Sequence, residues 1–190
     1  NPVNDAPSLV SISNVYTDEE TNTSVSLNAT DIDGDTDFEF STSSSSELFE
    51  VSVSGSTLII VPGENQVGTG LVTVSVNDGN LSSESVNFDV TIENVNDVPV
   101  LSSIDSPSAV DEDGENISVS FSASDADGDE VSYTVDVENS DLFTSVLLDG
   151  NQLTLDPADD QSGSSQIYVF ASDGEASVAA EFSVLVNPVN

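Results

Sequence analysis

Aspartates in a short repeated pattern are the residues of this sequence best suited to do chemistry. The pattern Asp-x-Asp-Gly-Asp occurs at residues 31–35 and again at residues 125–129. Each copy has the same companions, an Asn-Asp pair before it and an Asp-Gly pair after it: Asn4-Asp5 with Asp78, and Asn96-Asp97 with Asp173. Ca²⁺ takes roughly six to eight oxygen ligands of this kind, whereas Mg²⁺ retains its waters and requires near-octahedral geometry. The pattern therefore predicts calcium binding.

Each motif taken singly has a simpler interpretation. Asp-x-Asp-Gly-Asp can be a plain turn, because Asp and Gly favour turn conformations. Asn-Asp-Gly and Ser-Asp-Gly are ordinary hairpin turns, and Glu20, Asp35 and Asp113 can simply be solvated. The pattern is not an EF-hand, since it lacks the glycine at the sixth position and the flanking helices. Its recurrence in register is what favours a metal site.

Composition excludes most catalysis. The chain has no Lys, Arg, His or Cys, and its 36 acidic residues give a formal charge of −36. A nucleophilic serine has no base to activate it, and nucleic acids find no cationic side chain. Disulfides and zinc sites of His or Cys cannot form either. Paired acids alone could run a glycosidase, but that needs a substrate cleft, so we expect no enzyme.

Charge and hydropathy together predict a folded extracellular protein. A surface this negative repels itself unless counterions relieve the repulsion, and divalent cations are the obvious candidates. The hydrophobic content of 36% is that of a globular protein. No apolar run approaches the roughly twenty residues that cross a bilayer, so we expect no membrane insertion. With neither an initiator methionine nor a signal peptide, the sequence is interpreted as a fragment of a longer secreted or surface polypeptide.

A repeated segment divides the chain into two domains. Near copies of it occupy residues 1–7 and 93–99, and a third begins at residue 187. They predict domains at residues 1–95 and 96–190. Within each domain, apolar residues alternate with polar ones in short runs separated by turn signals, as in Val72-x-Val74-x-Val76, and helical periodicity is absent. The pattern predicts an all-β fold: two tandem seven-stranded Greek-key β-sandwiches of immunoglobulin type, arranged end to end.

This fold brings the acidic turns together. In such a sandwich the second-to-third and sixth-to-seventh turns lie at the pole where the chain begins. The opposite end of the first domain, where its chain leaves the sandwich, carries Glu19, Glu20 and Glu64 from other turns. We expect both sets to meet at the junction and share Ca²⁺. The predicted ligands are Glu19, Glu20 and Glu64 from the first domain and Asn96, Asp97, Asp125, Asp127 and Asp173 from the second, with Asn4, Asp5, Asp31, Asp33 and Asp78 as the equivalent set at the start.

The order of these motifs resembles the cadherin repeat. It is most similar to the cadherin-like and immunoglobulin-like repeats of about 95 residues in large bacterial surface proteins, and the resemblance covers the whole chain twice. It implies Glu19 as the first-strand glutamate, with the linker and paired aspartates in the roles given above. Residues 62–65 depart from the cadherin Asp-Arg-Glu segment, so only Glu64 is carried over there.

Two functions of different classes follow. The first is a calcium-rigidified extender or adhesion module, whose partners are Ca²⁺, neighbouring repeats of the same polypeptide and possible adhesins or polysaccharides. The alternative is a carbohydrate-binding module, which would use Tyr168 and Phe170 if both rings point outward together from the sixth strand. The preferred interpretation of these rings is a local shift of parity or a covering segment. Strand exchange, as in animal cadherins, has little support because the chain has no Trp.

Overall fold

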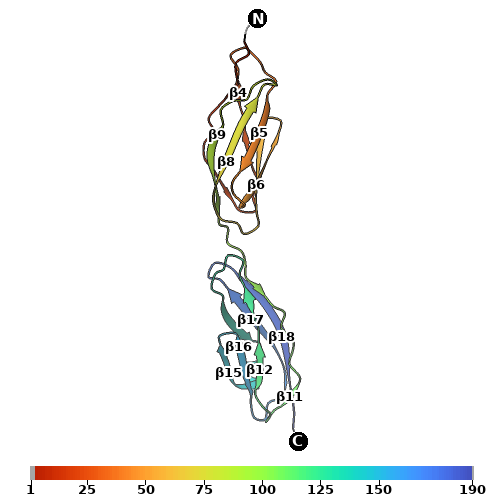
Figure 1. Cartoon of the computed structure of the whole chain (residues 1–190). Helices are drawn as coiled ribbons and strands as arrows, with labels where there is room; N and C mark the ends of the chain where they lie inside the picture. Colours follow the sequence, from red (N-terminus) through yellow and green to blue (C-terminus); the bar gives the residue numbers. More distant parts are fainter. Residues whose placement is uncertain (1–2, 190) are drawn as a thin grey trace. The chain divides into compact units, whose positions relative to one another are not determined.

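The chain folds into two β-sandwiches. The structure is a computed structural model that describes residues 3–189, and it divides into two compact units, Asn1–Val95 and Asn96–Asn190. The predicted all-β, immunoglobulin-like class is confirmed in both units (Figure 1). Among the described residues, the helical content is a single 3-10 turn, η1 (Ser140–Leu142). No helix in that part of the chain is long and apolar enough to cross a membrane.

In the first unit one sheet has the order β2-β9-β8-β5 and the facing sheet the order β3-β7-β6, while β1 pairs with β4. The strands are β1 (Ser8–Leu9), β2 (Val15–Asp18), β3 (Thr23–Ser26), β4 (Ala29–Thr30), β5 (Glu39–Ser44), β6 (Phe49–Ser54), β7 (Thr57–Pro62), β8 (Gly68–Asn77) and β9 (Val86–Glu93).

The second unit repeats this arrangement, with sheets β11-β18-β17-β14 and β12-β16-β15 and the pair β10-β13. Its strands are β10 (Val100–Leu101), β11 (Val110–Asp111), β12 (Ile117–Ser120), β13 (Ala123–Ser124), β14 (Ser132–Val137), β15 (Phe143–Asp149), β16 (Gln152–Pro157), β17 (Gly163–Ser172) and β18 (Ser177–Asn187). Both β7 and β16 end at prolines, which cannot donate to a ladder.

The first strand of each sandwich is divided between two sheets. In the first unit β1 pairs antiparallel with β4, and the chain then crosses to the other sheet, where β2 pairs in parallel with β9. The second unit does the same with β10 and β11. The parallel register sets Asp18 beside Glu93, so the residue that follows β2, Glu19, lies at the end of β9. This crossing therefore positions the first-strand glutamate.

Alternation along the long strands builds one core per unit. Val72 and Val74 of β8 are fully buried and pack with Leu58 and Ile60 of β7 in the opposite sheet. Burial of such a side chain contributes roughly 1.5–3 kcal/mol. The second unit forms the equivalent core around Ile167 and its neighbours. Packing of this kind holds the turns at the sandwich ends in place.

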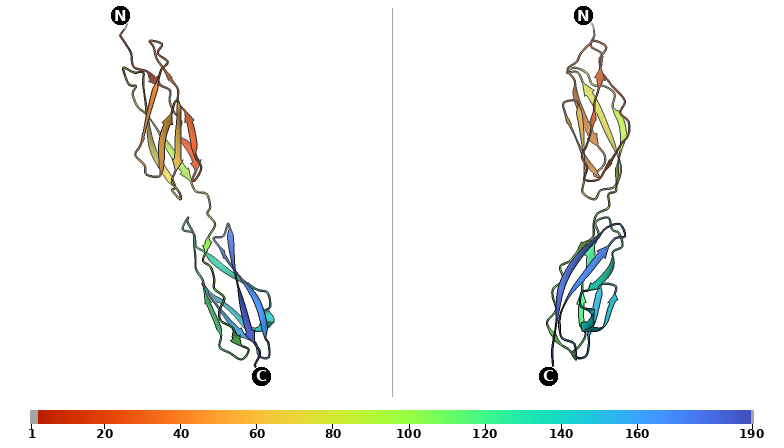
Figure 2. Two further views of the ribbon diagram at one scale, coloured as in Figure 1. Left: turned by 90° about the vertical axis from the view of Figure 1, so that its right-hand side faces the viewer. Right: turned by 180° about the vertical axis from the view of Figure 1, so that it is seen from behind.

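Each unit has two poles, defined by the hairpin of its last two strands. In the first unit Asp78 follows β8 at one end of this hairpin, and Glu93 ends β9 at the other. Since β9 has 8 residues and a strand rises about 3.3 Å per residue, the ends are about 26 Å apart. Within each unit, the long strands run between its two ends, as Figure 2 shows. We call the end where the unit begins its N-terminal pole and the other its C-terminal pole.

Of the two explanations expected for Tyr168 and Phe170, a local shift of parity in the sixth strand of the second unit is wrong. Ile167, Val169 and Ala171 are fully buried, so the residues between them face away from the core. Phe170 is 37% exposed and Tyr168 is half-buried. Both rings therefore point outward from β17, because the strict alternation of this strand continues through them.

Candidate metal centres

The N-terminal pole of the second unit brings together the ligands predicted in that unit. The Asn96 amide donates to Asp173 Oδ2 at 3.0 Å, and the backbone N–H of Asp97 donates to Asp127 Oδ2 at 2.7 Å. The Asp127 N–H in turn donates to Asp125 Oδ1 at 2.9 Å. These bonds join three segments of the second unit: the start of the unit, the turn at residues 125–129 and the turn after β17.

Carboxylates at this pole lie close enough to share an ion. Oxygen atoms of Asp125, Asp127 and Asp129 all lie within 4.8 Å of one another. Asp125 Oδ2 is buried and has no hydrogen-bond partner in residues 3–189. Asp129 was not among the predicted ligands, although it is the third aspartate of Asp-x-Asp-Gly-Asp and the motif itself marks it. We call these residues, with Asn96, Asp97 and Asp173, the second N-terminal cluster.

The first unit repeats these three hydrogen bonds. The Asn4 amide donates to Asp78 Oδ2 at 2.9 Å, the Asp5 N–H to Asp33 Oδ2 at 2.6 Å, and the Asp33 N–H to Asp31 Oδ1 at 2.7 Å. Asp31 Oδ2, like its counterpart in the second unit, is buried without a partner in the described chain. We call these five residues the first N-terminal cluster.

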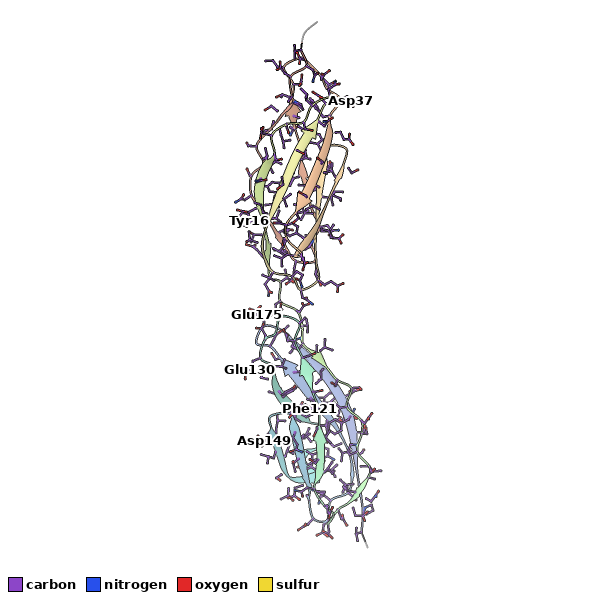
Figure 3. All side chains as sticks on the ribbon, in the orientation of Figure 1. Tyr16, Asp37, Phe121, Glu130, Asp149 and Glu175 are labelled. Atoms are coloured by element: carbon purple, nitrogen blue, oxygen red, sulfur yellow. The ribbon has the colours of Figure 1, made fainter. Side chains whose placement is uncertain are left out.

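Hydrogen bonds keep two of these carboxylates ionised. The backbone N–H of Leu81, followed by the asparagine amide of the cluster, lowers the pKa of Asp78 below its ordinary value. The N–H of Ala176 and the equivalent amide lower the pKa of Asp173 in the same way, while desolvation opposes both. Another donor to Asp173 is the N–H of Glu175, which Figure 3 places at the N-terminal pole. A carboxylate stabilised in its charged form is a suitable cation ligand.

The C-terminal pole of the first unit is organised by Glu19. Its side chain is only 3% exposed, and its Oε1 accepts a hydrogen bond from the backbone N–H of Val95 at 3.0 Å. Oε2 is buried and has no partner within residues 3–189. A buried carboxylate oxygen that lacks a donor is costly, and the sequence contains no cationic side chain to pair with it.

Glu20 and Glu64 do not join this group in the structure. Glu20 follows Glu19 with a left-handed backbone, φ 58°, and its side chain is exposed. Glu64 is also exposed, and only its carbonyl oxygen is engaged, by Gln66 at 3.4 Å. In the part of the chain that is described, Asp125, Asp127 and Asp129 are the sole set of three or more acids whose carboxylate oxygens all lie within 4.8 Å of one another.

The prediction omitted Glu112, the counterpart of Glu19 in the second unit. It is 7% exposed, and its Oε1 accepts from the Val189 N–H at 2.9 Å. The repeat itself carried the signal, because Val110-Asp111-Glu112 aligns with Thr17-Asp18-Glu19. Each unit therefore has an acidic cluster at its N-terminal pole and one buried glutamate at its C-terminal pole.

Comparison with known families agrees with this architecture. A family profile described as "Bacterial Ig domain" matches residues 4–91 and again residues 96–185. A search of curated proteins returns no match to the sequence.

Solved structures show the same fold at low identity. Human protocadherin-24 EC1-2 is 20% identical, with a TM-score of 0.57 over 97% of this chain and 100% of that one. Drosophila N-cadherin EC1-4 is also 20% identical, with a TM-score of 0.58 over 97% of this chain and 50% of that one. An endo-fucoidan hydrolase of glycoside hydrolase family 107 is 18% identical, with a TM-score of 0.40 over 100% of this chain and 30% of that one.

Proposed function

The chain belongs to the bacterial Ig-domain family, with one copy in each unit, and from this premise we propose that it is a calcium-binding repeat module of a large extracellular protein. The module acts as an extender in adhesion, and its partners are Ca²⁺ and the neighbouring repeats of the same polypeptide. Its location is the cell surface or the secreted space. No catalytic step is assigned to it.

The observation that supports this function best is the set of buried, unpartnered carboxylate oxygens. They belong to Glu19, Asp31 and Asp125. Buried charges are normally paired with an opposite charge or coordinate a metal, and this sequence contains no Lys, Arg or His. A hard divalent cation fits ligands that are all oxygen. Ca²⁺ is therefore proposed at the N-terminal clusters, with Glu19 and Glu112 as ligands at the C-terminal poles.

The same residues explain how an ion would stiffen the chain. Val95 is bonded to Glu19 within the first unit, and Asn96 is bonded to Asp173 within the second. These two linker residues are consecutive. Ca²⁺ at Glu19 would hold the linker to the first unit, and Ca²⁺ at the second N-terminal cluster would hold it to the second. We propose that Ca²⁺ binding stiffens the chain because it restricts the motion of the linker at Val95 and Asn96.

Titration and scattering test the proposal on the whole chain. Isothermal titration with Ca²⁺, in parallel with Mg²⁺ as the control ion, is expected to give affinities near about 10⁻⁴ to 10⁻³ M for Ca²⁺, as in extracellular modules. Small-angle scattering is expected to show a narrower range of dimensions with Ca²⁺ than with chelator. An unchanged scattering curve and an unchanged melting temperature at millimolar Ca²⁺ would contradict the function.

The carbohydrate-binding alternative has one supporting observation. Tyr168 and Phe170 face outward together, and sugar rings commonly stack on exposed aromatic rings. A pull-down on polysaccharides, comparing the natural chain with Tyr168→Ala, tests it: retention that depends on Tyr168 would support it. The alternative ranks second because the groups beside Tyr168 are carboxylates, which favour a cation over a neutral sugar.

A further inference from the structure

The outer face of β14, β17 and β18 in the second unit carries an aromatic pair in a setting of negative charge. Tyr168 and Phe170 are two positions apart on β17, so their rings follow one another along the strand at about 7 Å. Figure 1 shows β17 and β18 side by side. Within residues 3–189 the phenol oxygen of Tyr168 makes no hydrogen bond, so the fold does not use it.

Carboxylates flank Tyr168 on both sides. Asp136 of β14 and Glu181 of β18 are its direct register partners, and both side chains are exposed. Side chains that are directly opposite across an antiparallel ladder have Cβ atoms about 5 Å apart. Neither carboxylate is hydrogen-bonded to another residue of the described chain. Tyr168, itself half-buried, therefore lies between two exposed carboxylates that have no hydrogen-bond partner in the described chain.

The first unit shows that the sandwich does not require this arrangement. At the equivalent place Thr73 of β8 lies between Ser43 of β5 and Asn87 of β9. All three are polar and uncharged, and Ser75 replaces Phe170. Both units nevertheless form the same sheet with fully buried alternate residues. The aromatic ring and its two acids thus occur together in one unit and are absent together from the other.

We infer that this face, which we call the Tyr168 face, binds an arginine side chain presented by a basic segment of a partner protein. A guanidinium group stacks on an aromatic ring, which attracts cations through its negative face. The same planar group pairs with carboxylates in bidentate geometry. Asp136 and Glu181 stand on either side of the ring where such a group would lie, so one side chain can engage the ring and an acid together.

Charge and shape decide between the possible occupants. Anionic polymers are repelled by a chain of charge −36. A neutral sugar would gain from the rings but has no net charge to complement the two acids, and a cationic partner complements both. The site lies on the outer face of a sheet, along which an extended segment can lie. It lies in the middle of β17, away from both poles, so it stands apart from the proposed calcium sites.

A binding experiment on the whole chain tests the inference. The probe is a fluorescein-labelled, glycine-rich peptide with two arginines, measured by fluorescence anisotropy at physiological ionic strength, with and without Ca²⁺. Its control has citrulline in place of arginine, which keeps the shape and removes the charge. The variant Tyr168→Thr/Phe170→Ser gives the two aromatic positions the residues of the first unit, keeps Asp136 and Glu181, and leaves the net charge unchanged. Leu147→Thr, at a side chain 61% exposed on β15, is the matched control.

We expect the Tyr168→Thr/Phe170→Ser variant to bind the arginine peptide about fivefold to tenfold more weakly than the natural chain, and Leu147→Thr to bind normally. Asp136→Ser/Glu181→Asn should weaken binding more than Glu115→Gln/Asp149→Asn, which removes the same charge elsewhere in that unit. Melting temperatures verify that each variant folds. The inference would be overturned if the two charge variants, Asp136→Ser/Glu181→Asn and Glu115→Gln/Asp149→Asn, bound the peptide equally, or if Tyr168→Thr/Phe170→Ser kept the affinity of the natural chain. It would also be overturned if the chain bound an amino-sugar or neutral polysaccharide through Tyr168 and did not bind the peptide.

Discussion

Glu19 accepts a hydrogen bond from the backbone N–H of Val95 at 3.0 Å, although 76 residues separate them. Glu112 and Val189 repeat the bond at 2.9 Å over 77 residues. In Glu19 this bond uses one carboxylate oxygen and leaves the other buried without a partner in residues 3–189. One acid therefore fastens the end of the first unit and keeps an oxygen available for a cation.

Replacing Glu19 with Gln separates these two roles. The amide oxygen can still accept the Val95 N–H, while the buried charge disappears. We expect Glu19→Gln to melt no lower than the natural chain in chelator, because it removes an unpaired buried charge. Its stabilisation by Ca²⁺ should be reduced, because a neutral amide is a weaker calcium ligand. Differential scanning calorimetry with and without Ca²⁺ measures both effects.

Glu20→Gln is the matched control for this variant, since it removes the same charge from the adjacent, exposed position. It should leave both melting temperatures nearly unchanged. Equal effects of the two variants on the calcium-dependent shift would show that burial of Glu19 is irrelevant to binding.

Asp125→Asn tests the second N-terminal cluster. Asp125 Oδ1 accepts the N–H of Asp127 at 2.9 Å, and an amide oxygen can still do so, so the turn should persist without metal. The buried Oδ2 becomes an NH₂ group, which cannot ligate Ca²⁺. We expect calcium affinity at this pole to fall at least about tenfold, measured by isothermal titration. Asp105→Asn, at an exposed position outside the cluster, should titrate like the natural chain.

Acid should weaken the N-terminal poles through Asp78 and Asp173. Hydrogen bonds lower the pKa of both in the folded state, so the unfolded chain binds more protons near pH 4. Their contribution to stability is therefore fully present above the unfolded pKa of about 3.9 and is lost as pH falls through the lower folded pKa. We expect Asp78→Asn/Asp173→Asn, in chelator, to show a shallower loss of melting temperature below pH 4 than the natural chain. Parallel curves for the two proteins would refute this assignment.

Gly70 is required in β8 by a close approach. A Cβ atom there would overlap Ser46 Cβ and lie 2.7 Å from Phe49 Cε1. We expect Gly70→Ala to destabilise the first unit by about 1–3 kcal/mol through overpacking, measured by urea unfolding. The second unit has Ser165 at this position, where its Oγ accepts the Asn139 N–H at 3.0 Å. Ser165→Ala should cost only about 0.5–1.5 kcal/mol, the value of one hydrogen bond, and an equal loss from both variants would contradict the steric explanation.

Local sequence patterns determined the strands, the repeat and the acidic turns of this protein. Alternation such as Val72-x-Val74 specifies a strand with one buried face, because successive side chains point to opposite sides of a sheet. Recurrence of the Asn-Asp pairs marked the repeat, and the aspartate turns predicted which side chains would gather at the N-terminal poles. These features were readable because each depends on residues a few positions apart. The calcium they predict remains a prediction.

Tertiary structure decided what depends on distant segments. Glu19 and Glu20 are neighbours of the same type, yet the parallel pairing of β2 with β9 buries the first and leaves the second in water. The Tyr168 face is set by the register of three strands, which brings Asp136 and Glu181 to the same ring. Sequence spacing encodes the period of one strand, but the register between strands is selected only when both faces of the sandwich pack into one core.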